Sequence, residues 1–425
     1  MVFSRTAGRR RFGPAALLAS VAVMTLVLAA CGSPDSAPAG TDSGSASAAP
    51  KGAPIKTMTI SAVDYNGPTY EDIQITAKLF ESWVNDNGGI NGRPLEVMTC
   101  DDKGDPTQTT ACARKAIEAG AVADVGSFSF NGGVMVPIYD KAKTAVFGNC
   151  CDIAPIEFTS PNTFQMGNNP ALNAGGIARA AQDGCKSIGV LELDIPGVTD
   201  ALNILFTNVA KAYGYTGKLK FVKVPLTTQD YTSQVAQITD GTDCISMFLS
   251  QSNITGMMPP FAQSGAKQRL YGPQGNFDKV ATKGYEDLPA VKDGVVYGAY
   301  PPLDRPVWKD LRGAIEKYDA PKKFDYNGLA TLGTWAAYTA FAQIVTKMEG
   351  EVTAETFLAA ASTSTVDTGG MTPVIDFTKT YDAFDGAYKR AFSRQLTYFK
   401  LSDFSQVGDS VFVDLSDAME GKPQQ

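Results

Sequence analysis

Cys31 is the residue near the N-terminus with the clearest chemical role, because its thiol directly follows an apolar run. Four arginines precede this run, at positions 5, 9, 10 and 11, and residues 15–30 are almost wholly apolar. Ala29 and Ala30 are small, as a signal peptidase requires of its cleavage site. At roughly 16 residues the run is shorter than the about 20 that span a membrane. The pattern predicts an export signal over residues 1–30 that is removed from the mature chain.

The tetrapeptide Leu28-Ala29-Ala30-Cys31 resembles a bacterial lipobox, in which the cysteine becomes residue one and carries lipid. We therefore expect Cys31 to tether the chain to the extracytoplasmic face of the cell membrane; an ordinary secretory signal with a chance cysteine is the alternative. Arginines 9–11 also weakly resemble a twin-arginine signal. Residues 31–54 are mostly Gly, Ser, Ala, Pro and Thr, which favours a flexible linker over a short glycosylated stalk.

Six further cysteines could form disulfides. They are Cys100, Cys112, Cys150, Cys151, Cys185 and Cys244. An even count in an exported protein favours disulfides, although six cysteines allow 15 pairings. We expect the first two to pair with each other and the last two likewise. The adjacent Cys150 and Cys151 then form a vicinal pair or remain free thiols. For each expected disulfide, free buried cysteines are the alternative. Because no pair has zinc-finger spacing, we expect no metal.

The charges of the chain argue against several classes of function. The sequence has 37 basic and 44 acidic side chains, a net charge of −7, and no histidine. Loss of residues 1–30 removes four arginines and no acid, which leaves 33 basic side chains and a charge near −11. A dispersed acidic balance argues against a nucleic-acid partner. The lack of histidine removes the commonest general base. We therefore expect that the protein is not an enzyme and has no cofactor. A hydrolase that uses carboxylates for catalysis is the remaining enzymatic alternative.

The elements that position a binding site alternate between strands and helices in two successive runs. We expect strands at residues 58–63, 95–99, 123–125, 145–147, 187–193, 220–224, 244–249, 269–271 and 295–300. We expect helices at residues 73–87, 106–119, 135–143, 199–213, 231–239, 257–264 and 329–348. Such alternation implies parallel βαβ units. We therefore predict an α/β fold with two doubly wound parallel-sheet lobes, split near residues 165–169.

Open parallel sheets bind ligands at the carboxyl ends of their strands, where helix N-termini carry positive partial charge. The loops at these ends are residues 64–70, 127–133, 148–154, 194–199, 249–253 and 272–276. We expect a small ligand to contact these loops.

Three segments follow one another in a characteristic order. They read NDNGGINGRPL at 85–95, DDKGDP at 101–106 and YGPQG at 271–275. In this order and spacing they resemble the type I periplasmic binding proteins of the Leu/Ile/Val-binding group, the partners of ABC importers. The resemblance runs from about residue 55 to about residue 398.

The resemblance implies two lobes joined by three crossover segments, with a ligand cleft between them. It places residues 55–167 and 300–375 in lobe 1, and residues 168–299 and 376–425 in lobe 2. It further implies that the lobes close on a small solute and that a membrane permease recognises the closed form. In amino-acid binders of this group, two loops of lobe 1 hold the ligand's carboxylate.

This chain departs from the amino-acid binders at both ends of the ligand. Cysteines replace a small-residue and threonine pair in the loop at 149–152, where Asp152 would repel a carboxylate unless it instead caps the next helix. Gln274 stands where the family has an acid that meets an ammonium, and Pro196 where it often has an aromatic. We therefore expect a ligand without a free amino-acid head: an amide or urea, an aromatic or short-chain acid, or a polyol.

The candidate ligand-binding side chains lie in the predicted loops and offer hydrogen bonds or aromatic faces. They are Tyr65, Asn66, Tyr70, Phe128, Ser129, Asn131, Asn149, Cys150, Cys151, Asp152, Pro196, Gln251, Gln274 and Asn276, with Phe130 as a further aromatic. Asn and Gln also favour turns and loop aromatics also pack lobes, so a structural role is the alternative for each.

Together these features predict a monomeric, lipid-anchored, extracytoplasmic solute-binding protein of an ABC importer. Its solute is a small polar molecule that is amino-acid-like, an amide or a small organic acid, and its protein partner is the membrane permease. A surface sensor of the same fold, which signals to a membrane partner, is the alternative.

Overall fold

The computed structural model describes residues 49–149, 154–167, 170–195, 199–225, 227–380 and 393–424. The described residues lie in one compact unit. The expected export signal, Cys31 and most of the linker lie outside the described residues, as do Cys150, Cys151, Asp152 and Pro196. Within the described ranges, no helix is both long enough and apolar enough to cross a membrane.

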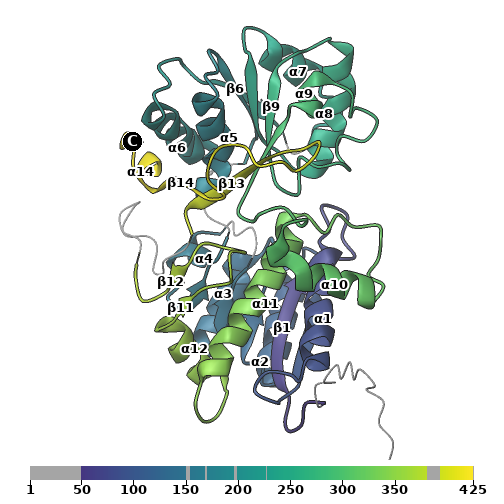
Figure 1. The fold of residues 1–425 in the computed structure, drawn as a ribbon, viewed down its shortest axis with the longest axis vertical. Helices are drawn as coiled ribbons and strands as arrows, with labels where there is room; N and C mark the ends of the chain where they lie inside the picture. The colour runs from purple at the N-terminus through teal and green to yellow at the C-terminus, as the bar shows by residue number, and fades with distance from the viewer. Residues whose placement is uncertain are drawn as a thin grey trace, which may run out of the picture. The chain divides into compact units, whose positions relative to one another are not determined.

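The first sheet has five parallel strands in the order β2-β1-β3-β4-β5, and its strand β1 is labelled in Figure 1. The strands are β1 (Ile55–Ser61), β2 (Leu95–Asp101), β3 (Ala123–Val125), β4 (Ala145–Phe147) and β5 (Thr163–Phe164). Its helices are α1 (Glu71–Asp86), α2 (Pro106–Glu118), α3 (Gly132–Lys141) and α4 (Pro155–Thr159), with α10 (Lys309–Lys317), α11 (Leu329–Lys347) and α12 (Ala354–Ser362) returning later in the chain. A short 3-10 turn, η1 (Pro306–Trp308), precedes α10.

Alternate residues of β1 show how helices cover both faces of this sheet. Met58 and Ile60 are buried in a cluster with apolar side chains of α2 and α3. The hydroxyls of Thr57 and Thr59 point the other way and hydrogen-bond to the Tyr338 hydroxyl of α11, at 3.1 and 2.7 Å. A parallel sheet is stable only when both faces are covered in this manner.

The second sheet has seven strands in the order β14-β13-β10-β9-β8-β6-β7. They are β6 (Ile188–Leu193), β7 (Lys220–Val224), β8 (Cys244–Phe248), β9 (Arg269–Pro273), β10 (Val295–Gly298), β13 (Gln395–Lys400) and β14 (Val413–Asp414). The last two pair antiparallel and the others are parallel. Its helices are α5 (Pro170–Gln182), α6 (Thr199–Ala212), α7 (Thr232–Thr239), α8 (Gln251–Gln263) and α9 (Pro289–Lys292), and α14 (Ser416–Met419) packs on α6. A ribbon of β11 (Thr365–Val366) and β12 (Ile375–Asp376) pairs with neither sheet.

The α/β fold of two mostly parallel sheets confirms the expected fold class. Several elements differ from their expected bounds by a few residues, and α8 differs most, because it begins at Gln251 rather than near residue 257. The Ser250 hydroxyl accepts from the N–H of Asn253 at 3.3 Å and so caps the helix six residues early. As a consequence, Gln251 lies in the first turn of a helix and not in a loop.

Two disulfides link neighbouring elements of the sheets. Cys100 in β2 bonds to Cys112 in α2, and Cys185, just before β6, bonds to Cys244 at the start of β8. Both pairings confirm the expected ones. Each bond ties a strand of a sheet to an element beside it.

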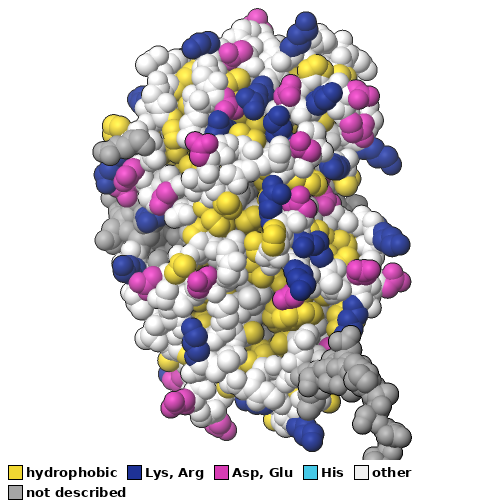
Figure 2. Space-filling view, in the orientation of Figure 1, with side chains coloured by type: hydrophobic (Ala, Val, Ile, Leu, Met, Phe, Trp, Pro, Cys, Tyr) yellow, Lys and Arg dark blue, Asp and Glu magenta, His cyan; other side chains and the backbone are white. Residues whose placement is uncertain are grey.

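Basic and acidic side chains are interspersed over the face drawn in Figure 2, with apolar side chains between them. Several of the charges are paired across distant parts of the chain, such as Lys143 with Glu355 at 2.7 Å and Lys317 with Asp86 at 2.6 Å. Exposed pairs of this kind contribute little to stability. The drawn face therefore offers mixed charge rather than a surface of one sign.

Candidate functional site

Aromatic rings gather at the carboxyl edge of the first sheet. Tyr65 and Tyr70 follow β1, and Phe128 and Phe130 follow the adjacent β3. The Phe128 ring centroid lies 4.6 Å from that of Tyr70 and 4.8 Å from that of Phe130, and Tyr65 lies 5.8 Å from Phe130. Burial, helped by nearby Asp72, raises the pKa of Tyr70 to about 12, whereas Tyr65 is 39% exposed. The fold thus brings the predicted aromatics together into one cluster with a solvent-facing ring.

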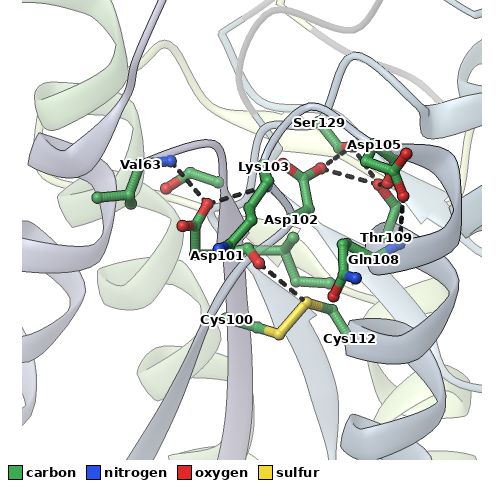
Figure 3. Close-up of a disulfide and its surroundings, with 12 residues drawn as sticks. Val63, Cys100, Asp101, Asp102, Lys103, Asp105, Gln108, Thr109, Cys112 and Ser129 are labelled. Atoms are coloured by element: carbon green, nitrogen blue, oxygen red, sulfur yellow. Dashed lines mark hydrogen bonds between the residues drawn. A yellow bond between two sulfur atoms is a disulfide. The ribbon is translucent and has the colours of Figure 1, made fainter. Parts of the chain in front are cut away.

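The carboxylate of Asp101, at the end of β2, holds the loop that carries Tyr65 (Figure 3). Its oxygens accept from the backbone N–H groups of Val63, Asp64 and Lys103 at 2.8, 3.0 and 2.9 Å. Burial alone would raise the pKa of Asp101, but these hydrogen bonds lower it below its ordinary value. The carboxylate is therefore a fixed acceptor around which the loop after β1 is built.

The neighbouring carboxylate, Asp102, fixes the loop after β3 in the same way (Figure 3). It is fully buried and accepts from the hydroxyls of Ser129 and Thr109, the latter at 3.0 Å. The Ser129 oxygen accepts from the N–H of Asn131 at 3.1 Å, and the Asn131 amide donates to the Thr109 hydroxyl at 3.1 Å. Ser129 and Asn131 thus shape this loop, and their contact with a ligand stays a prediction.

Two buried amides at the carboxyl ends of β4 and β5 have unpaired polar atoms. Asn149 is 3% exposed, and neither its nitrogen nor its oxygen has a hydrogen-bond partner in the described part of the chain. Gln165 donates to the carbonyl of Glu157 at 3.1 Å, but its own amide oxygen is unpaired among the described residues. Buried polar atoms are nearly always paired, so this edge has unused capacity for hydrogen bonds. The sequence predicted Asn149 but carried no signal for Gln165.

At the second sheet, the predicted residues Gln251 and Asn276 hold the ends of β8 and β9. The Gln251 amide donates to the carboxylate of Asp278, and the Asn276 amide donates to the carbonyl of Leu249 at 3.0 Å. Burial raises the pKa of Asp278. The site that Asp278 and Gln251 form is polar, in contrast to the aromatic edge of the first sheet.

The amide of Gln274 is already engaged. It is 2% exposed and donates to the backbone carbonyls of Tyr300 and Asn327 at 3.2 and 3.3 Å. The next residue, Gly275, has a φ of +83°, and a Cβ there would lie 3.0 Å from the nitrogen of Leu329. Gln274 therefore links the end of β9 to the segment that leads into α11. The ligand contact predicted for Gln274 stays a prediction.

Sequence reasoning missed Glu192, a buried acid near the carboxyl end of β6. One of its oxygens accepts from the Asn203 amide at 3.2 Å, and the other has no partner among the described residues. Burial raises the pKa of Glu192 to about 7. A charged residue inside the apolar run at 187–193 was the available signal.

The predicted residue Asn66, beside Tyr65, is exposed.

A pocket of about 370 Å³ lies among residues 301–307, 397–399 and 406–412 with Gly370. Its lining is largely apolar and includes none of the predicted ligand-binding residues. We therefore base the site on the strand ends and not on this pocket.

The comparison with protein families agrees with this arrangement. The sequence model of a family described as periplasmic binding protein matches residues 65–389. The chain belongs to the periplasmic binding protein family. This is a family of solute-binding proteins, and the match runs through both sheets. No curated protein matches this periplasmic binding protein.

Solved structures show the same fold. A fatty acid ABC transporter substrate-binding protein from Thermomonospora curvata has a TM-score of 0.66 at 16% identity, over 88% of this chain and 96% of that one. A solute-binding protein of an ABC transporter from R. palustris, in complex with benzoate, has a TM-score of 0.63 at 17% identity, over 85% of this chain and 98% of that one. A leucine-binding protein from Thermotoga maritima has a TM-score of 0.64 at 16% identity, over 85% of this chain and 99% of that one. These likenesses confirm the type I periplasmic-binding-protein fold.

Proposed function

We propose that this protein is a lipid-anchored, extracytoplasmic solute-binding protein that captures a small polar solute by lobe closure and delivers it to the permease of an ABC importer. The observation that carries the proposal is the cluster of Tyr65, Tyr70, Phe128 and Phe130 at the carboxyl edge of the first sheet. Such an edge is where open parallel sheets bind ligands. The structural neighbours that are substrate-binding proteins of ABC transporters support the transport role.

The proposal includes two lobes, residues 55–167 with 300–375 and residues 168–299 with 376–425. It assigns the lipid to Cys31 and the solute to the predicted loop residues of both lobes. The buried, unpaired amide of Asn149 supports this placement, since a solute that enters there gives the amide the partners it lacks. We further propose that the protein acts as a monomer beside its permease.

Native mass spectrometry of the full mature protein, purified from membranes, tests the proposal. We expect a co-purified small molecule and an N-terminal mass that includes lipid on Cys31. We also expect Tyr65→Ala to weaken solute binding about tenfold, the cost of roughly 1.4 kcal/mol of lost ring contact. Val374→Ala, which removes an exposed side chain elsewhere, is the control. A protein without bound solute that also fails to bind any of a broad metabolite panel contradicts the solute-binding role.

A further inference from the structure

The chain that returns beside β13 bulges away from that strand next to the pocket of about 370 Å³. The return is paired with β13 at Val407, whose N–H donates to the carbonyl of Tyr398 at 2.8 Å. Pairing resumes at Val413 of β14. Only Thr397 of β13 lies between these two pairs, so residues 408–412 have no room in the ladder. They form a bulge, and such features often shape functional sites.

The pocket lies between this bulge and the segment that follows β10. Its lining comes from Gln406, Val411 and Phe412 of the returning chain, from residues 397–399 of β13 and from the segment 301–307. Val411 is 49% exposed, which is unusual for a large apolar side chain in this protein. A molecule in the pocket would therefore remove apolar surface from water.

Hydrogen bonds hold the segment after β10 in place. The indole of Trp308 donates to the carbonyl of Pro301 at 2.9 Å. The guanidinium of Arg312 donates to the carbonyls of Leu303 and Arg305, at 2.6 Å each. Because this wall is already ordered, a ligand that contacts it loses little affinity to ordering of the chain.

The lining is apolar apart from a few polar groups, the combination found in small-molecule sites. Its apolar side chains outside β13 are those of Pro301, Pro302, Pro306, Val307, Val411 and Phe412. A surface of this kind fits an apolar or aromatic body.

Arg305 is the single charged residue in the described lining of the pocket. Its guanidinium donates to the carbonyl of Phe404 at 2.6 Å and to the carboxylate of Asp304 at 3.3 Å. The Asp304 side chain is 50% exposed, and such exposed ion pairs are weak. These two bonds use two of the five N–H donors of a guanidinium. Arg305 can therefore also bind an anion, and a carboxylate matches the geometry of its donors.

We propose that this pocket is a second ligand site, separate from the strand ends, and that it binds a small apolar or aromatic carboxylate whose acid group meets Arg305. The volume of about 370 Å³ is at the lower end of the range of roughly 300–1,000 Å³ for small-molecule sites, so the ligand is one compact molecule. This inference goes beyond the proposed function and does not depend on it.

Matched pairs of carboxylate and amide test the proposal by calorimetric titration at pH 7.5 into the full mature protein. The probes are benzoate and benzamide, phenylacetate and phenylacetamide, and isovalerate and isovaleramide. We expect at least one carboxylate to bind, and to bind ten times or more tightly than its amide, a difference of about 1.4 kcal/mol or more.

Two variants locate the bound probe. Val411→Trp fills the pocket from an exposed position, and we expect it to weaken binding of the carboxylate at least tenfold. Val280→Trp, at a side chain that is 51% exposed elsewhere, is the matched control and keeps the affinity. Tyr65→Ala, at the strand ends, keeps the affinity as well.

A third variant tests the charge. We expect Arg305→Gln to weaken binding of the carboxylate at least tenfold and to leave that of the amide unchanged. Arg114→Gln, which removes the same charge from an exposed position on α2, is the control. Thermal unfolding reports whether each variant folds, and the comparison of carboxylate with amide in the wild type decides the role of charge if Arg305→Gln does not fold.

No binding of any carboxylate probe up to about 10 mM, a free energy weaker than roughly −3 kcal/mol, overturns the inference. Full affinity in a folded Val411→Trp variant places the probe outside the pocket and also overturns it. Equal affinity of carboxylate and amide overturns the role of Arg305. Each of these results leaves the proposed function intact, because that function is tested by the co-purified solute and by its loss of affinity in Tyr65→Ala.

Discussion

At the scale of single residues, the first sheet contains a buried acid that the site does not use. Asp124 in β3 is fully buried, and the Tyr139 hydroxyl donates to its Oδ2 at 3.0 Å. Its Oδ1 has no partner among the described residues. Burial raises the pKa of Asp124 from 3.8 to about 7, although the hydrogen bond from Tyr139 opposes the shift. The acid is therefore protonated in the folded protein at mildly acidic pH.

This residue predicts a dependence of stability on pH. Between pH 4 and pH 7 the folded chain holds a proton on Asp124 that the unfolded chain has lost, so the free energy of unfolding falls as pH rises, by up to roughly 4 kcal/mol from this residue. The Asp124→Asn variant has no such proton. We expect its stability relative to the wild type to increase across this range, measured by urea unfolding at several pH values. Asp240→Asn, at an 89% exposed side chain, is the control, and a constant difference for Asp124→Asn would falsify the assignment.

At the scale of elements, the two disulfides constrain loops of very different length. The Cys100–Cys112 bond closes 12 residues between β2 and α2, and the Cys185–Cys244 bond closes 59 residues between the start of β6 and the start of β8. The second loop contains all of α6, β7 and α7. A cross-link restricts the unfolded chain more when its loop is longer.

We therefore expect unequal losses when each disulfide is removed by paired Cys→Ala substitution. The chain-entropy model gives about 3 kcal/mol for the shorter loop and about 4 kcal/mol for the longer one. Urea unfolding of the two double variants, both compared with the wild type without reductant, measures the difference. A larger loss for the Cys100 and Cys112 pair would show that local packing, and not loop length, sets the contribution.

Elements were predictable from the sequence where apolar residues repeat with one clear period. The helix α1 follows such a repeat, and the strand β6 follows a short continuous apolar run. The helix α5 was not predicted, although its residues 170–182 are rich in alanine and glycine. Small residues give a weak periodic signal, and α5 is buried because Gly175 and Gly176 let the side chain of Tyr297 approach closely.

At the scale of the whole molecule, Gln274 connects parts of the chain that lie far apart in sequence. Its amide joins the end of β9 to the carbonyls of Tyr300 and Asn327. The Tyr300 carbonyl also accepts from the Thr397 hydroxyl at 3.0 Å. The Asn327 carbonyl therefore depends more than the Tyr300 carbonyl on the hydrogen bond from Gln274. These bonds couple the second sheet to the segment that leads into α11.

We expect Gln274→Ala to destabilise the protein by about 1–3 kcal/mol, because it leaves the buried Asn327 carbonyl without this donor. We also expect thermal unfolding of the parts built on the two sheets to become less cooperative, so that a calorimetric scan resolves two transitions. Gln237→Ala is the control, since that exposed amide bonds to Ser233 within α7. A single transition at unchanged temperature would show that Gln274 does not couple the second sheet to the segment that leads into α11.

The sequence by itself determined the fold class and the loops in which the aromatic cluster lies. These follow from local patterns: alternating strands and helices, and residues that end strands. The two disulfides were expected from the sequence among 15 possible pairings, and the structure confirms them. Only the tertiary structure decided that Ser129 is bound to Asp102 and that Gln274 is engaged by Asn327. Each of these contacts depends on which segments lie side by side once both faces of a sheet are covered, and no local period in the chain encodes that.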